Sequence, residues 1–324
     1  MIWPASMGIL AKSPSCVTGL RLLIFHEALH EWNFRSIDLT LLKKQNFESA
    51  EWKTNKEGHE FLLVKNPHEL IQAAGYLKYV HAKDHSQGVY FRGQGKLYGA
   101  LSPAIYRNIK TQSSRDKREA ALSKLVGEVR RSAGIFKGFG DYAHEPLLQH
   151  YGISTTWIDL VDNVWIALWF ACNRAIISGK LKEHLHFEER NHSPDDEFVY
   201  ILLVAADIAQ RNKREPGLFF GPNTELVDLR MAVPSIFLRP HAQHALLFRQ
   251  VGSGTAGRPI DYQNNVCGVV GVEVNKALEW LGSGKMVSSH SLFPPPFYDH
   301  GFDILLGLKL TASGSIGNIV HIAA

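Results

Sequence analysis

The chain has few cysteines and no pairs of them. Cys16, Cys172 and Cys267 lie far apart and form no Cys-x-x-Cys spacing, which excludes the usual patterns of cysteine-based zinc sites and of disulfide frameworks. Cys172 stands inside an apolar run, where a free cysteine behaves as a small buried hydrophobe. We therefore expect a protein of the reducing cytoplasm that carries no metal.

Long apolar runs and two common catalytic signatures are missing as well. Lys12 and Arg21 interrupt the apolar start of the chain, so we expect neither a signal peptide nor a membrane span. The sequence holds no Gly-x-x-x-x-Gly-Lys-[Ser/Thr] loop and no Gly-x-Ser-x-Gly elbow. These absences exclude the standard patterns of P-loop nucleotide hydrolases and of α/β-hydrolases.

What remains is an ordinary globular composition. Hydrophobic residues make up 45% and charged residues 20% of 324 positions, which argues against disorder and allows a substantial core. The net charge of +4 is mildly basic, and it permits contact with nucleic acid without requiring it.

Caps and periodicity predict the main helices. Asn66, Pro67 and Glu69 have the pattern of a helix start, and the helix should continue through Leu77. A capping box of Ser113 and Asp116 should open a helix with basic outer faces, which indicate a solvated surface more than a nucleic-acid patch. Further helices are expected at 164–176, after Asp162 and Asn163, and at 275–281.

Apolar runs predict the strands and, with them, the fold class. Strands are expected at 61–64, 89–92, 198–205, 268–274 and 303–310, with a turn at 93–95 and an exposed loop at 180–196. The prediction is an α+β fold with mixed central β-sheets flanked by helices. We expect a single domain over residues 1–324, with a core at about 89–250, an N-terminal helical extension at 1–88, and strands and a helix at 251–324.

Three polar clusters are candidates for a binding site. The first is Phe91-Arg92-Gly93-Gln94-Gly95. An arginine can hold phosphate or carboxylate in two places, and glycines let the backbone approach a ligand. The alternative is a strand-end arginine in a surface ion pair.

The second cluster is Gln149 to Asp159, which places several polar groups before an apolar helix. His150 can titrate near neutral pH or hydrogen-bond a ribose, and Tyr151 can stack on a flat ring. Thr155, Thr156 and Asp159 can hold a loop as readily as touch a ligand.

The third cluster runs from Asp228 to Phe248 and includes Arg239, His241, Gln243 and His244. His241 and His244 are three residues apart, so they can share a helix face. No third metal ligand with a matching context accompanies them, and we expect no metal here.

The three clusters, in this order, resemble the FRG domain. The tripeptide Phe91-Arg92-Gly93 with Gln94 is similar to the motif that names the family. Gln149 to Asp159, followed by Ala167 to Ala171, resembles its Gln-His-Tyr-Gly segment, and Arg239 with Gln243 resembles its last element. Ser154, Thr156, Ala245 and Leu247 depart from the family pattern, which puts local turn geometry in question.

The layout of these clusters is also similar to ADP-ribosyltransferases, and this resemblance implies NAD as co-substrate. By the likeness Arg92, His150 and Gln243 would be catalytic. Arg239, His241 and His244 would contact the substrate, and Glu225 and Asp228 are reserve carboxylates. The remaining cofactor-binding residues would be Phe91, Gly93, Gln94, Gln149, Tyr151, Thr155 and Asp159.

The expected function is an NAD-dependent ADP-ribosyltransferase-like toxin or antiphage defence effector. Its acceptor would be a macromolecule, nucleic acid slightly ahead of protein, and an antitoxin is a possible partner. The alternatives are an NAD glycohydrolase and a non-catalytic module that binds nucleotide or nucleic acid through Arg92 and the basic helix after Ser114.

Overall fold

The computed structural model describes residues 37–83, 86–179, 184–193, 196–211, 214–252, 260–308, 310 and 315–322. All of them belong to one unit that spans residues 35–324. Cys16 and the first part of the expected N-terminal helical extension lie outside these residues. No helix among the described residues has the length and apolarity needed to cross a membrane.

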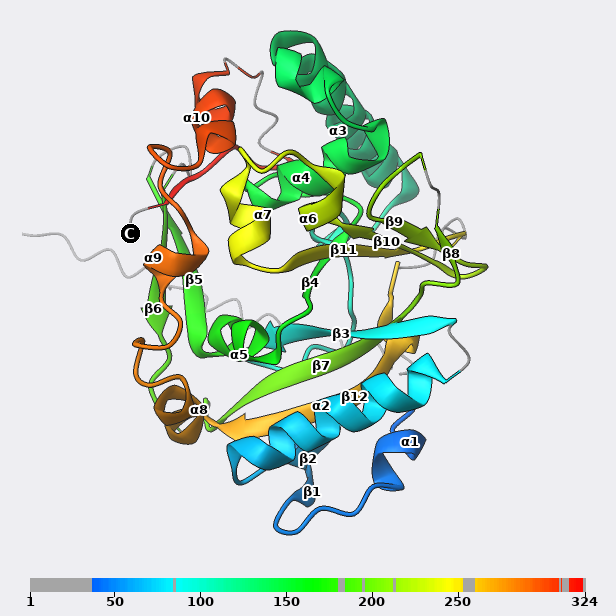
Figure 1. The fold of residues 1–324 in the computed structure, drawn as a ribbon, viewed down its shortest axis with the longest axis vertical. Coiled ribbons are helices and arrows are strands. Elements are labelled where there is room, and N and C mark those ends of the chain that lie inside the picture. The colour runs from blue at the N-terminus through cyan, green and yellow to red at the C-terminus, as the bar shows by residue number, and fades with distance from the viewer. Residues whose placement is uncertain are drawn as a thin grey trace, which may run out of the picture. The chain divides into compact units, whose positions relative to one another are not determined.

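Ten of the described strands form one mixed sheet in the order β1-β2-β12-β7-β3-β4-β11-β10-β9-β8 (Figure 1). Neighbours are antiparallel except for β2 and β12, which are parallel. Their bounds are β1 Glu51–Thr54, β2 Glu60–Leu63, β3 Gln87–Gln94, β4 Ile158–Val161, β7 Phe198–Asp207, β8 Gln210–Arg211, β9 Leu218–Phe220, β10 Thr224–Asp228, β11 Ala245–Gln250 and β12 Val266–Glu273. A smaller sheet has the order β13-β6-β5, with β5 Asn173–Ser178, β6 His184–Glu189 and β13 His321–Ile322.

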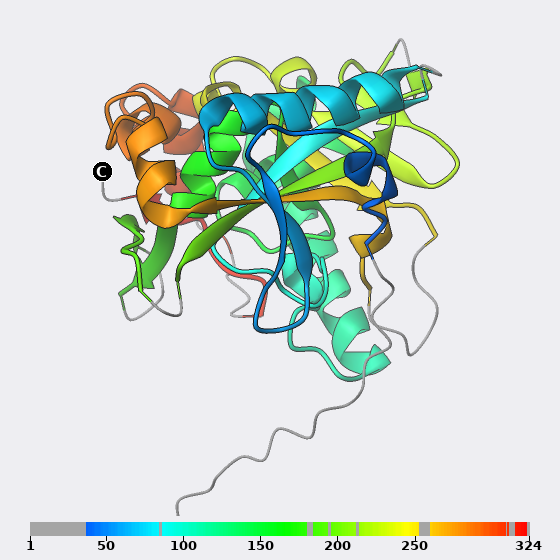
Figure 2. The same ribbon diagram turned by 90° about the horizontal axis from the view of Figure 1, so that it is seen from below.

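Helices pack on both halves of the large sheet. Their bounds are α1 Thr40–Lys43, α2 Pro67–Ala82, α3 Gln112–Ser132, α4 His144–His150, α5 Val164–Cys172, α6 Leu229–Ala232, α7 Leu238–Ala242, α8 Val274–Trp280, α9 Ser289–Leu292 and α10 His300–Gly307, with 3₁₀ turns η1 Ala104–Tyr106, η2 Gly134–Lys137, η3 Asp141–Ala143 and η4 Gln263–Asn265. In Figure 2, α2 lies above and α3 below strands β7 and β12. The structure therefore has a mixed α and β fold with mixed sheets.

Several local predictions are confirmed because the signals are local. Asn66 accepts a hydrogen bond from the Glu69 amide at 3.0 Å, and Pro67 begins α2. Asn163 caps α5 by accepting from the Trp165 amide at 2.9 Å. The apolar runs at 61–64, 198–205 and 268–274 fall on β2, β7 and β12.

Other predictions were wrong where strand pairing or burial decides the outcome. The expected turn at 93–95 begins inside β3, because Gly93 and Gln94 pair with Ile201 and Tyr200 of β7. The helix expected at 164–176 ends at Cys172, where the Asn173 side chain donates to the Trp169 carbonyl at 2.8 Å. The next residues form β5 on β6, which itself lies within the expected loop at 180–196.

The secondary structure predicted near the two ends of the chain was also partly wrong. The strand expected at 303–310 is largely α10, capped by Asp299 and burying Phe302 and Leu305 on one side. The expected helical extension contains strands β1 and β2, and β2 pairs with β12, so both ends of the described chain contribute to the large sheet. The capping box predicted at Ser113 and Asp116 was wrong as well. The cap of α3 is Thr111, whose hydroxyl accepts a hydrogen bond from the Ser114 amide at 3.2 Å.

The large sheet opens between β3 and β4. These strands pair only at Phe91 and Val161, whereas β3 pairs with β7 along its whole length. Figure 1 shows β4 running between the β3–β7–β12 half and the β10–β11 half. Beyond this pair β3 and β4 do not pair with each other, and the candidate site lies beside this opening.

Candidate functional site

Arg92 is held in place at the opening of the sheet. Alternation along β3 sends Phe91 into the core and puts Arg92 and Gln94 on the other face. Arg92 Nη1 donates to the Asp159 carbonyl at 2.8 Å, and Nε donates at 3.2 Å to the Gln94 amide oxygen when that oxygen is turned toward it. Burial lowers the pKa of the Arg92 guanidinium, and the Asp159 carboxylate opposes this shift.

Packing against the backbone of α5 leaves no room for a side chain at Gly93, whereas at Gly95 a side chain would have to displace the end of the Arg190 side chain. A Cβ on Gly93 would lie 1.8 Å from the Ala167 carbonyl of α5, and a Cβ on Gly95 would lie 2.0 Å from the Arg190 guanidinium carbon. Side chains at these positions would collide with neighbouring protein. The expectation that a glycine lets a ligand approach the backbone was therefore wrong for Gly93.

Arg92 lines a cavity of about 200 Å³. Its walls come from β3, η1, the end of α4 and the segment leading into β4. The lining residues are Arg92, Pro103, Ala104, Arg107, Gln149, Gly152, Ile153, Ser154, Trp157, Ile158 and Asp159. Two guanidiniums and one carboxylate thus share one small cavity, which we call the Arg92 pocket.

Asp159 connects the Arg92 pocket to His150. The His150 Nε2 atom lies 3.7 Å from the Asp159 carboxylate, and the His150 side chain is only 5% exposed. Nε2 makes no hydrogen bond. Burial lowers the pKa of His150, and the Asp159 carboxylate only partly offsets that effect. The imidazole is therefore neutral near pH 7 and lies behind the pocket wall.

Gln243 is placed behind His150 and away from the cavity. It is buried, its amide donates to the Leu292 carbonyl at 2.9 Å, and its side chain hydrogen-bonds the His150 imidazole. Of the three residues expected to be catalytic, Arg92 lines the pocket and His150 adjoins it. Gln243 supports His150 from the core.

The threonines of the second cluster shape its turn. Thr155 is buried, its hydroxyl donates to the Gln149 side-chain oxygen, and it accepts from the Trp157 amide at 3.2 Å. The Thr156 amide and hydroxyl both donate to Glu145, at 2.8 and 2.6 Å. These contacts fix the segment that carries Gln149 and Asp159 into the pocket.

Tyr151 and Arg239 form part of the core. The Tyr151 hydroxyl donates to Asp299 at 2.8 Å, its ring stacks on Phe302, and the Arg239 guanidinium lies 4.4 Å from its centroid. Both side chains are fully buried, and burial lowers the pKa of Arg239 to about 10. Neither lines the Arg92 pocket, so the stacking expected of Tyr151 and the substrate contact expected of Arg239 have no place in this structure.

The remaining residues of the third cluster lie beside an ion pair. His241 is in α7, whereas His244 has a left-handed φ of 51° beyond its end, so they do not share a helix face as expected. His244 Nδ1 lies 3.4 Å from Arg230, which donates to Asp228 at 2.7 and 2.9 Å. None of these residues lines the pocket.

The reserve carboxylates are already paired. Arg249 binds Glu225 at 2.6 Å and stacks over Trp157 at 4.3 Å, while Asp228 is held by Arg230. Asp159 is therefore the carboxylate that faces the Arg92 pocket. Among the described residues no group of His, Cys, Asp and Glu side chains is arranged to hold a metal ion.

No sequence pattern predicts a role for Arg107 in the site, and only a weak one predicts a role for Trp157. Arg107 follows η1, in a stretch without a motif, and reaches the pocket because its Nε donates to the Ser102 carbonyl at 3.2 Å. Trp157 stands inside the dense polar segment, which is the only signal it carries. Its Nε1 donor is buried without a hydrogen-bond partner.

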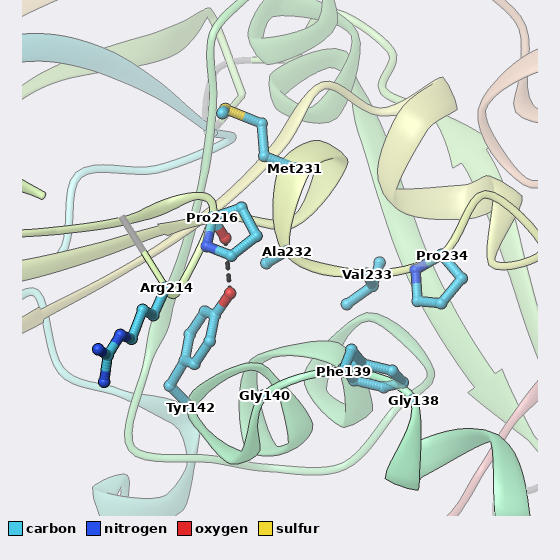
Figure 3. Close-up of a pocket in the computed structure, with 10 residues that line it drawn as sticks. All are labelled: Gly138, Phe139, Gly140, Tyr142, Arg214, Pro216, Met231, Ala232, Val233 and Pro234. Carbon is cyan, nitrogen blue, oxygen red and sulfur yellow. Dashed lines mark hydrogen bonds between the residues drawn. The ribbon is translucent and has the colours of Figure 1, made fainter. Parts of the chain in front are cut away.

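A larger cavity of about 380 Å³ lies elsewhere (Figure 3). Its walls include Phe139, Val233, Pro234 and Tyr142, whose hydroxyl donates to the Pro216 carbonyl at 2.6 Å. None of the residues expected to form the site lines it. Its walls lack the paired guanidiniums and the carboxylate that distinguish the Arg92 pocket.

Two further short patterns fall largely outside the described residues. Residues 26–30 have the sequence His-Glu-Ala-Leu-His, which is the spacing of a helical zinc site, and lie outside the described residues. Residues 252–257 have the sequence Gly-Ser-Gly-Thr-Ala-Gly, and only Gly252 of these is described. Such a glycine pattern indicates a dinucleotide site only where it opens a helix after a strand.

Comparison with known proteins identifies a known domain in one region of the chain. Residues 87–178 match the FRG domain. No curated protein and no solved structure matches the chain. The matched region begins with β3 and ends with β5, and it contains every residue that lines the Arg92 pocket. The chain thus carries an FRG domain there, whereas Arg239 and Gln243 lie beyond it.

Replacing Gln243 by alanine should lower stability more than binding. The change leaves the Leu292 carbonyl and the His150 imidazole without a partner, at a cost of about 1–3 kcal/mol in unfolding free energy. Denaturant unfolding and ligand titration on one preparation measure both effects. The exposed Gln72→Ala on α2 is the control. Unchanged stability together with a lost activity would instead assign Gln243 a direct role.

Proposed function

We propose that the Arg92 pocket binds the diphosphate and adjoining ribose of NAD, and that the protein is an ADP-ribosyltransferase-like enzyme. The observation that carries the proposal is the presence of Arg92, Arg107 and the Asp159 carboxylate in one cavity. Guanidinium groups hold phosphate oxygens in two places. The Gln94 amide and the Asp159 carbonyl keep Arg92 oriented for that contact.

The carboxylate supports the chemistry of transfer. When the bond between nicotinamide and ribose breaks, nicotinamide leaves with the electron pair and the ribose ring becomes positively charged. Asp159 would stabilise that charge or orient a ribose hydroxyl, beside the neutral His150. An acceptor then bonds to the anomeric carbon and loses its proton. In this proposal Asp159 takes the role first considered for Glu225, Asp228 and Gln243.

The size of the cavity limits how much of NAD it holds. Its volume of about 200 Å³ is below the roughly 300 Å³ at which pockets enclose a drug-sized ligand. The pocket therefore takes the diphosphate and the adjoining ribose, and the rest of the dinucleotide lies across the surface. A strained, partly enclosed ligand is consistent with an enzyme that works mainly by positioning and electrostatics.

A second candidate, an NAD glycohydrolase, is favoured by one observation. The Asp159 side chain is 45% exposed, so water can reach the proposed reacting centre and serve as the acceptor. The role of the protein as a toxin or defence effector stays a prediction, as does an antitoxin partner.

Nicotinamide release tests the proposal. Purified protein is incubated with NAD, with and without RNA, DNA or cell lysate, and compared with Asp159→Asn and with the exposed control Asp303→Asn. We expect Asp159→Asn to lose about 100-fold in release while NAD affinity changes by less than about fivefold. Release without acceptor indicates hydrolysis, and release only with acceptor indicates transfer. If the wild type neither binds NAD nor releases nicotinamide, the proposal fails.

A further inference from the structure

The positive charge of the chain is concentrated in one segment. Residues 107–131 contain eight Lys and Arg and three Asp and Glu, a net charge of +5, whereas the whole chain carries +4. The rest of the chain is therefore slightly negative. The segment includes Arg107, the loop after η1 and most of α3. Such segregation indicates a surface for a negatively charged partner.

The basic segment starts at the Arg92 pocket. Arg107 lines the pocket, and Arg118 of α3 donates to the carbonyls of Ile105 and Arg107 at 2.8 and 3.0 Å. These bonds fix the N-terminal half of α3 to the pocket wall. A partner that lies along α3 is thereby directed toward the pocket.

Three exposed cations continue along the outer side of α3. Lys117, Lys124 and Arg131 are seven residues apart, so they lie about 10.5 Å from one another in a row of roughly 21 Å. None of the three has a hydrogen bond or ion pair within the described residues, whereas Arg130 pairs with Asp141 at 2.6 Å. Glu128 is the one acidic residue beside this row. We call these three residues the α3 row.

An exposed aromatic ring lies close to Arg92 in the chain. Tyr98 follows β3, is 63% exposed, and is near enough to Arg92 to raise the pKa of its guanidinium slightly. An exposed ring beside a basic track is the combination that binds single-stranded nucleic acid, because bases stack on the ring while phosphates contact the cations.

We propose that single-stranded nucleic acid binds along the α3 row and stacks an unpaired base on Tyr98, which presents that nucleotide to the Arg92 pocket as the ADP-ribose acceptor. Only the acceptor role rests on the proposed function. A paired base cannot reach a cavity of about 200 Å³ without leaving its helix, which favours a single strand over a duplex.

The test measures the binding of labelled oligonucleotides to the full chain by fluorescence anisotropy, in the absence of NAD. The probes are labelled single-stranded DNA and RNA of about 12 nucleotides, with a duplex of the same length. The test variant is Lys117→Glu/Lys124→Glu/Arg131→Glu. The control variant, Lys44→Glu/Lys83→Glu/Lys285→Glu, changes net charge equally at exposed lysines on other elements.

We expect the α3 variant to lose at least about 30-fold in single-strand affinity at roughly 50 mM salt, with a salt slope smaller by about 2. The control should change by less than about threefold. Tyr98→Ala should weaken single strands about tenfold and leave the duplex nearly unchanged. The two single-stranded probes distinguish RNA from DNA as the acceptor.

Three results would overturn the proposal: no binding by the wild type, equal losses in the α3 and control variants, or ADP-ribosylation of protein alone. The binding test is independent of NAD chemistry. Strand binding that maps to the α3 row without nicotinamide release would retain the surface and reject the enzyme. Nicotinamide release together with unchanged strand binding across the variants would retain the enzyme and reject the surface.

Discussion

Arg92→Lys is expected to reduce nicotinamide release and NAD affinity by at least about 100-fold while the fold is kept. Lysine retains the charge but cannot make two parallel hydrogen bonds to a phosphate. Its single ammonium nitrogen also lacks the planar fork with which Arg92 reaches the Gln94 amide oxygen and the Asp159 carbonyl from two nitrogens. Isothermal titration with NAD and a discontinuous nicotinamide assay measure the two losses.

The exposed Arg211→Lys on β8 is the matched control, and it should behave as the wild type. Circular dichroism and melting temperature confirm that Arg92→Lys remains folded. Near-normal release by Arg92→Lys would show that a point charge is sufficient and would remove the two-point phosphate contact from the proposal.

Asp299→Ala is expected to have the largest effect on stability, a loss of about 3–5 kcal/mol in unfolding free energy. Asp299 is fully buried and accepts from the Tyr151 hydroxyl, the Arg239 amide and the Phe302 amide at 2.8, 3.1 and 2.9 Å. Its removal leaves the buried Arg239 guanidinium without its nearest negative charge. Urea unfolding at neutral pH measures the loss.

Two companion variants keep this result interpretable. Asp299→Asn preserves the shape and should lose less, and Asp303→Ala, four residues later and exposed, should lose less than about 0.5 kcal/mol. If Asp299→Ala does not fold, the comparison of Asp299→Asn with Asp303→Ala decides. A loss below about 1 kcal/mol for Asp299→Asn would show that Arg239 is stabilised mainly by its aromatic neighbours, at 4.4 and 4.5 Å.

Local sequence signals predicted much of the site. The caps at Asn66 and Asn163 depend on neighbours two or three residues away, and both are confirmed. Arg92 and Asp159, which the family resemblance implied as cofactor-binding residues, line one pocket, whereas His150 and Tyr151, also expected there with Arg92, do not line it. Alternation along a strand then predicts that the side chains of Phe91 and Arg92 lie on opposite faces of the sheet.

Burial and distant pairing could not be predicted in the same way. Tyr151 has the composition of a ligand-stacking residue, but Asp299, 148 residues later, holds its hydroxyl in the core. The run at 303–310 is apolar enough for a strand, and only the Asp299 cap and packing around Phe302 make it helical. Arg107 enters the pocket through a backbone contact that no motif encodes.

The absent side chain at Gly93 affects the rigidity of the molecule. Strand β3 and helix α5 meet there backbone to backbone, with the Ala167 carbonyl 1.8 Å from where a Cβ would stand. The spacing between these two layers is thus set by peptide groups, which have no rotamers to exchange. Arg92 directly precedes Gly93 on the same strand. Rotamer changes of core side chains should therefore shift the Arg92 guanidinium very little relative to helix α5.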